Sequence, residues 1–80
     1  MNKPQEDEII RRVRSGDTDA FGSLVDEYQK NVYNLALRMT GNPEDAQDMS
    51  QEAFIKAYNS LSSFRGDSKF SVWLYRIVSN

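Results

Sequence analysis

The chain has 80 residues, of which 39% are apolar and 28% are charged, and its net charge is −2. This length and composition indicate one folded domain with a modest core, and they exclude a disordered chain. No apolar run approaches the length of a membrane span, so membrane insertion is excluded, and the acidic N-terminus does not resemble a secretory signal. The absence of cysteine is typical of a cytoplasmic protein.

The first half of the chain predicts two helices. The first is short, and its apolar residues are Ile9, Ile10 and Val13. Ser15 and Gly16 end it, and Asp17 or Thr18 can cap the helix that follows. In this second helix, apolar residues recur at helical spacing over five turns: Phe21, Leu24, Val25, Tyr28, Val32, Leu35, Ala36 and Met39. Gly41 ends the second helix.

The second half predicts two more helices. Asn42 and Pro43 begin the third, because Asn is a favoured cap and Pro fits the first helical position. The buried face of this helix consists of Ala46, Met49, Ala53, Phe54, Ala57 and Leu61. Residues 62–69 form a loop, and the fourth helix then carries Phe70, Trp73, Leu74, Ile77 and Val78 on its buried face.

The fourth helix has no stop signal before Asn80, so we expect the chain to be a piece of a longer protein. Together the elements predict an all-α bundle of about four helices. Because the links between them are short, we expect neighbouring helices to run roughly antiparallel.

Some apolar residues lie outside the predicted buried stripes. Ile55 lies opposite the buried face of the third helix. Its neighbours there are carboxylates and amides: Glu44, Asp48, Gln51, Glu52 and Asn59. Such a face fits a protein-binding surface with one apolar anchor, although a single exposed apolar residue needs no explanation. Tyr33 and Leu37 are displaced from the stripe of the second helix, and we expect the first helix to pack on them.

The sequence argues against metal binding and catalysis. Glu44, Asp48 and Glu52 recur every four residues, so they spread over about 12 Å of one helix, whereas oxygen-only metal sites need converging ligands. The chain has no His and no Cys, and its four glycines stand singly. The commonest catalytic bases and nucleophiles and the phosphate-binding loops are therefore missing. We expect no metal, no cofactor and no enzymatic activity.

Charge is unevenly distributed along the second half. Residues 41–60 carry four acidic and one basic side chain, whereas residues 61–80 carry one acidic and three basic side chains. This contrast suggests different partners for the two surfaces. The tripeptide Arg65-Gly66-Asp67 resembles an adhesion motif, but without an export signal we interpret it as a chance occurrence.

Two long segments, DAQDMSQEAFIKAY (45–58) and SFRGDSKFSVWLYRI (63–77), together with Asn80, carry a family likeness. They resemble region 2 of bacterial RNA polymerase sigma factors of the extracytoplasmic-function group. GDTDAF at 16–21 and Tyr28 also fit, so the likeness covers nearly all of the chain from about residue 8. The resemblance implies one domain over residues 1–80, containing regions 2.1 to 2.3 and the start of region 2.4. The family's C-terminal domain, which reads the −35 element, is absent from these residues.

The resemblance also implies two binding surfaces. The acidic helix would dock on a coiled-coil of the β′ subunit of core RNA polymerase through Asp45, Asp48, Gln51, Glu52 and Ile55. The loop and the fourth helix would open the promoter −10 element and hold a flipped non-template base through Phe64, Arg65, Gly66, Asp67, Ser68, Lys69, Phe70, Tyr75, Arg76 and Asn80. The family further implies an anti-sigma protein as a competitor. The alternative is a helical protein-interaction module that binds no nucleic acid.

The loop residues suit the capture of an extruded base. Unstacking costs a few kcal/mol, which stacking, backbone hydrogen bonds and positive charge must recover. Gly66 allows close approach of the backbone, and Arg65 and Lys69 can contact phosphate. Phe70 and Trp73 share the buried stripe of the fourth helix, so we expect their rings to hold the loop in shape. Tyr75 and Arg76 are expected to point outward.

Overall fold

The computed structural model describes residues 1–80, which form helices and no strands. Its α-helices are α1 (Lys3–Arg14), α2 (Phe21–Thr40), α3 (Pro43–Ser60) and α4 (Phe70–Ser79). Two short 3-10 helices join them, η1 (Thr18–Ala20) before α2 and η2 (Leu61–Ser63) after α3. The predicted all-α class with four helices is confirmed. None of these helices has the length and apolar character needed to cross a lipid bilayer.

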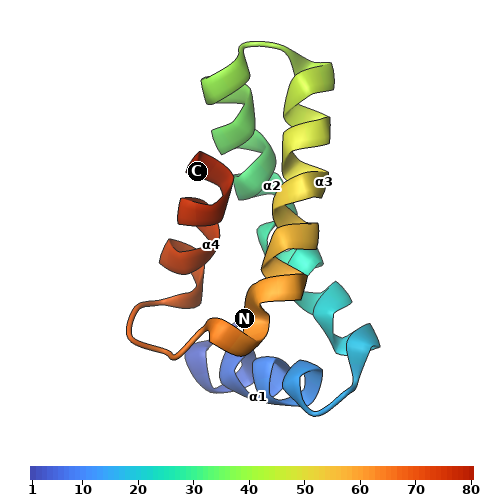
Figure 1. The fold of residues 1–80 in the computed structure, drawn as a ribbon, viewed down its shortest axis with the longest axis vertical. Coiled ribbons are helices and arrows are strands. Elements are labelled where there is room, and N and C mark those ends of the chain that lie inside the picture. The colour runs from blue at the N-terminus through green and yellow to red at the C-terminus, as the bar shows by residue number, and fades with distance from the viewer.

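α2 and α3 form an antiparallel hairpin (Figure 1). α2 ends at Gly41, whose φ of 68° is left-handed and whose amide donates to the carbonyl of Leu37 at 2.8 Å. Asn42 then caps α3, because its side-chain oxygen accepts hydrogen bonds from the amides of Glu44 and Asp45 at 2.8 and 3.2 Å. The predicted turn between these two helices is therefore confirmed.

Replacing Asn42 with alanine should lower the stability of the domain, since two amides at the start of α3 would lose their acceptor. The expected cost is about 1 kcal/mol. In a domain of this size this lowers Tm by about 4–8 °C. Thermal unfolding followed by circular dichroism measures the change. Asn34→Ala, at an exposed position within α2, is the control, and an equal loss of Tm there would contradict the capping role.

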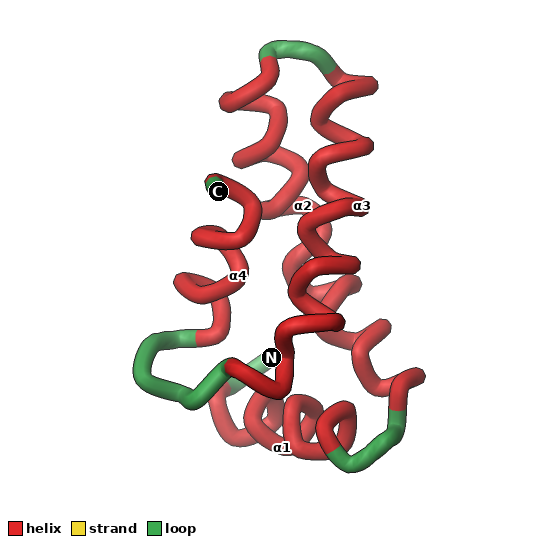
Figure 2. Tube along the Cα trace, in the orientation of Figure 1, coloured by secondary structure: helices red, strands yellow, loops and turns green.

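The core lies where α2, α3 and α4 meet. Its buried residues from these helices are Phe21, Leu24, Val32, Ala36, Ala46, Ala53, Ala57, Phe70, Leu74 and Val78. Four of them are alanines, and side chains this small let α2 and α3 approach each other closely. α4 packs beside the hairpin, and the longest connection in the chain, between η2 and α4, brings it there (Figure 2).

α1 lies across the open end of the hairpin (Figure 1). A capping box formed by Asn2 and Gln5 begins this helix. It was not predicted from the sequence. The predicted antiparallel arrangement is wrong for α1, which instead buries Ile10 and Val13 at the base of the bundle. The apolar residues of α1 indicate that one face is buried, but they do not say against which neighbour.

The expected contact between α1 and Tyr33 is also wrong. Tyr33 lines a groove between α2 and α3, and Leu37 is half-buried against the common core. α1 instead reaches α2 one to two turns earlier, where Glu6 accepts a hydrogen bond from the Tyr28 hydroxyl. Two boundaries also differ from the prediction. Asp17 makes no side-chain capping bond. η2 takes Leu61 from the predicted third helix and Ser62 and Ser63 from the predicted loop, which therefore begins at residue 64.

Candidate protein-binding face and nucleic-acid interface

We define the acidic face as the five residues of α3 that were predicted to bind protein: Asp45, Asp48, Gln51, Glu52 and Ile55. All five are exposed. The side chain of Ile55 keeps 62% of its surface accessible, which confirms that it lies outside the core. Lys56 is the only cation paired on this helix, at 3.4 Å from Glu52. The face therefore offers an apolar side chain surrounded by carboxylates that are mostly free to meet a basic partner.

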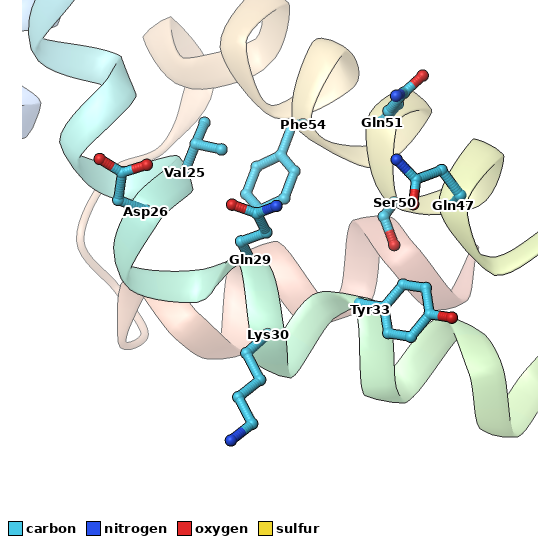
Figure 3. A pocket seen from close by; sticks show the side chains of 9 residues that line it. All are labelled: Val25, Asp26, Gln29, Lys30, Tyr33, Gln47, Ser50, Gln51 and Phe54. Atoms are coloured by element: carbon cyan, nitrogen blue, oxygen red, sulfur yellow. The ribbon is translucent and has the colours of Figure 1, made fainter. Parts of the chain in front are cut away.

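A groove of about 530 Å³ lies beside the acidic face, between α2 and α3. Figure 3 shows side chains of both helices turned into it, with the rings of Phe54 and Tyr33 among them. Gln51 belongs both to this groove and to the acidic face, so the two are continuous. Its lining residues are Val25, Asp26, Gln29, Lys30, Tyr33, Gln47, Ser50, Gln51 and Phe54. This groove was not predicted from the sequence, although the displaced Tyr33 was a signal of it.

In loop 64–69, between η2 and α4, every backbone amide after that of Phe64 is without an acceptor in the chain. Gly66 turns the chain with a φ of 78°, a conformation that glycine adopts without strain. No amide from Arg65 to Lys69 donates a hydrogen bond to another group of the chain. The first turn of α4 adds further free amides, because Lys69 provides no side-chain cap. The loop thus presents a row of donors to solvent.

The loop borders a groove of about 510 Å³ whose opposite wall is the start of α1. Gly66, Asp67, Ser68, Lys69 and Phe70 line one side, and Asn2, Lys3, Glu6, Asp7 and Tyr28 are among the residues of the other. Burial raises the pKa of the Tyr28 hydroxyl, and its hydrogen bond to the Glu6 carboxylate raises the pKa further. Tyr28 therefore stays protonated and donates. Sequence reasoning did not place α1 at this groove.

The aromatic rings of the loop point inward. Phe64 and Phe70 are only 8% and 2% exposed. Their ring centres lie 5.7 Å apart, and Phe64 lies 5.2 Å from the ring of Trp73. Edge-on and tilted contacts at these distances are favourable. A base could stack on either ring only if the ring left the core, so in this structure the rings hold the loop in position.

The remaining predicted residues lie apart from the loop groove. Arg65 lines a separate groove on the other side of Phe64. Tyr75 is half-buried, with its ring 6.4 Å from that of Tyr28, so it does not point fully outward. Arg76 is exposed, and Asn80 lies beside α3 in a small depression shared with Glu52 and Lys56. The structure therefore gathers Phe64 and residues 66–70 into one site and spreads Arg65, Tyr75, Arg76 and Asn80 over a wider surface.

Residues 24–80, which are more than half of the chain, match the Sigma-70 region 2 family. The chain belongs to the Sigma-70 region 2 family. Region 2 is part of a transcription initiation factor and is not an enzyme, in agreement with the sequence analysis. The matched residues include α3, α4 and the loop between them, but they exclude α1.

This region 2 domain is similar to several curated sigma factors of the extracytoplasmic-function group. It is 51% identical over 72 residues to the ECF RNA polymerase sigma-E factor of Escherichia coli, covering 90% of this chain and 37% of that protein. It is 51% identical over 71 residues to the ECF RNA polymerase sigma factor SigW of Bacillus subtilis, covering 89% of this chain and 38% of that protein. The resemblance stated from the sequence is therefore confirmed.

A third relative is the RNA polymerase sigma-H factor of Pseudomonas aeruginosa, 46% identical over 80 residues, which are 100% of this chain and 42% of that protein. The chain thus spans about two fifths of the length of these relatives. Among solved structures, the domain is similar to an engineered region 2 of sigmaE in complex with GTAAAA. That likeness has a TM-score of 0.88 at 44% identity, and it covers 100% of this chain and 84% of that one.

Proposed function

We propose that this region 2 domain binds core RNA polymerase through the acidic face of α3 and captures unwound −10 promoter DNA with loop 64–69 and α4. In this account a non-template base leaves the stack and enters the groove beside the loop. The domain would act in the cytoplasm, on the polymerase, and an anti-sigma protein would compete for the same surfaces. The observation that carries the DNA-binding part is the row of unused amides around Gly66.

The polymerase-binding part is supported by the exposed Ile55 and its acidic surroundings. An apolar anchor ringed by charges of one sign is the pattern of a protein-binding hot spot that selects a basic partner. The adjoining α2–α3 groove can accept side chains from the same partner, because Gln51 belongs to both the groove and the acidic face. The proposed partner surface is the coiled-coil of the β′ subunit.

The DNA-binding part is supported by chemistry and by similarity. Backbone donors can hydrogen-bond the edge of an extruded base, while Arg65, Lys69 and Arg76 are exposed for contact with phosphate. A similar structure, the engineered region 2 of sigmaE, was solved in complex with GTAAAA. By analogy, we propose that this domain also binds a single DNA strand.

The test is a titration of labelled single-stranded −10 oligonucleotides at several salt concentrations. Replacing Arg65, Lys69 and Arg76 together with glutamine should weaken binding. It should also make the salt slope less steep by about 2, at roughly 0.7 for each lost phosphate contact on a single strand. A triple glutamine variant of Arg11, Arg12 and Lys30, which lie away from the loop, is the matched control. It should bind as the unaltered domain does.

The alternative function is a helical protein-interaction module without nucleic-acid binding. It has some support in the α2–α3 groove, which extends the acidic face. The same titration separates the two functions, since the alternative predicts no measurable affinity for any single-stranded −10 oligonucleotide even at low salt.

A further inference from the structure

Arg14, the last residue of α1, connects this helix to the start of the loop. Its guanidinium donates from Nε and Nη2 to the carbonyl oxygen of Leu61, at 3.3 and 3.1 Å. The same guanidinium lies 5.8 Å from the centre of the Phe64 ring, within the range of a cation–π contact. One side chain therefore holds η2 and the first residue of loop 64–69, although it is 47 residues away from Leu61 in the sequence.

No other side chain from outside residues 60–69 makes a hydrogen bond to this segment. The backbone of loop 64–69 makes hydrogen bonds only at its two ends. The amide of Phe64 donates to the carbonyl of Leu61, and the carbonyl of Lys69 accepts from the amide of Trp73, both at 3.1 Å. The shape of the loop is thus set at its two ends, by Leu61 and Phe64 on one side and by Phe70 on the other. At the first end, Arg14 contacts both the carbonyl of Leu61 and the ring of Phe64.

Phe64 transmits this constraint to the proposed DNA site. Its ring is a wall shared by two grooves, one containing Arg14 and Arg65 and the other containing Gly66 and the loop amides. A shift of Phe64 would also disturb its packing on Phe70, the residue that follows the loop and begins α4. The orientation of the amides therefore depends on a contact made by α1.

We propose that Arg14 is a positioning residue for single-strand capture. It holds loop 64–69 in the shape that binds DNA, and it does not itself contact phosphate. The inference rests on the proposed function of the loop. It makes α1, which lies outside the residues matched to the family, part of the DNA-capturing apparatus.

The test measures oligonucleotide affinity against salt for Arg14→Gln and Arg14→Lys in the whole 80-residue chain. If Arg14 positions the loop, Arg14→Gln lowers the fraction of molecules with a competent loop, so Kd rises about tenfold while the salt slope stays unchanged. Lysine keeps the charge but lacks the planar guanidinium with its several donors, so the Arg14→Lys variant should also bind the oligonucleotide weakly. Arg12→Gln is the matched control, because Arg12 has the same charge and pairs with Glu8 only.

The competing explanation is a direct phosphate contact by Arg14. In that case Arg14→Gln would reduce the steepness of the salt slope by about 0.7, and Arg14→Lys would restore the affinity. Either result would overturn the inference, as would an unchanged Kd for Arg14→Gln. If the unaltered chain bound no −10 oligonucleotide at all, the proposed function itself would be wrong and the inference would fail with it.

A structural readout separates positioning from general destabilisation. In Arg14→Lys we expect amide chemical shifts to move in residues 61–70, whereas the amides of the acidic face and its affinity for core polymerase should stay unchanged. Changes spread through α2 and α3 would mean that Arg14 supports the whole fold and not the loop, and would contradict the inference.

Discussion

Replacing Ile55 with glutamate is expected to abolish binding to core RNA polymerase. Docking would bury the new carboxylate among Asp48, Gln51 and Glu52, where desolvation and like-charge repulsion both oppose it. Hot-spot side chains contribute 2 kcal/mol or more, so the loss of affinity should be roughly 30-fold or greater. Because Ile55 is 62% exposed, the free energy of unfolding should change by less than about 0.5 kcal/mol. Equilibrium binding to core polymerase and helicity by circular dichroism measure the two effects.

Val72→Glu is a suitable control for this experiment. Val72 is another exposed apolar residue, at 38% exposure, but it lies on α4 and outside the acidic face. The same introduced charge there should leave polymerase affinity unchanged. If Ile55→Glu bound polymerase as tightly as the unaltered domain, the assignment of the acidic face would be refuted.

Replacing Gly66 with valine is expected to impair oligonucleotide capture more than stability. A β-branched residue at a φ of 78° is strongly disfavoured. Because loop 64–69 has few internal hydrogen bonds, it can relax to another conformation at little cost in unfolding free energy. Recovering the original shape for binding would then cost about 1–3 kcal/mol, which corresponds to a loss of affinity of about 5- to 150-fold. Titration with a −10 oligonucleotide and thermal unfolding test the two parts.

Gly41→Val provides the matched control, because Gly41 also has a positive φ, of 68°. Gly41 ends α2, and its amide donates to Leu37 at 2.8 Å, so the strain cannot be relieved without loss of that bond. This variant should lose stability and retain its affinity for the oligonucleotide. Equal losses of affinity and stability in Gly66→Val would show instead that the loop has only a structural role.

The two surfaces were predictable from the sequence to different degrees. Helical periodicity placed Ile55 among carboxylates and amides, because these residues belong to one helix and successive residues are 100° apart. The family resemblance then supplied the five residues of the acidic face, Asp45 among them. The loop was found from its turn residues and from the family resemblance. The residues that line its groove from the other side, Asn2 and Glu6 at the start of α1 and Tyr28 in α2, were not predicted as part of a site. No local pattern relates these residues to a loop so far along the chain.

The ring of Phe64 shows the same limit at the level of a single side chain. Helical spacing places Phe70 in the buried stripe of the fourth helix, but Phe64 lies in the loop before it, where a phenylalanine can lie in the core or on the surface. The contacts with Trp73 and Arg14 decide the matter by burying both rings. These contacts turn the rings away from solvent and leave the backbone of the loop as its proposed binding surface.

The sequence by itself determined the α2–α3 turn at Gly41 and Asn42, the amphipathic character of α2, α3 and α4, and the exposed position of Ile55. These features depend on interactions within a few residues along the chain, namely capping, backbone conformation and helical spacing. Only the tertiary structure decided that α1 crosses the base of the bundle, that Arg14 holds Leu61, and that grooves form on both sides of Phe64. These features arise from packing between helices distant in the sequence, where shape and hydrogen-bond geometry select one arrangement among several that the same apolar pattern allows.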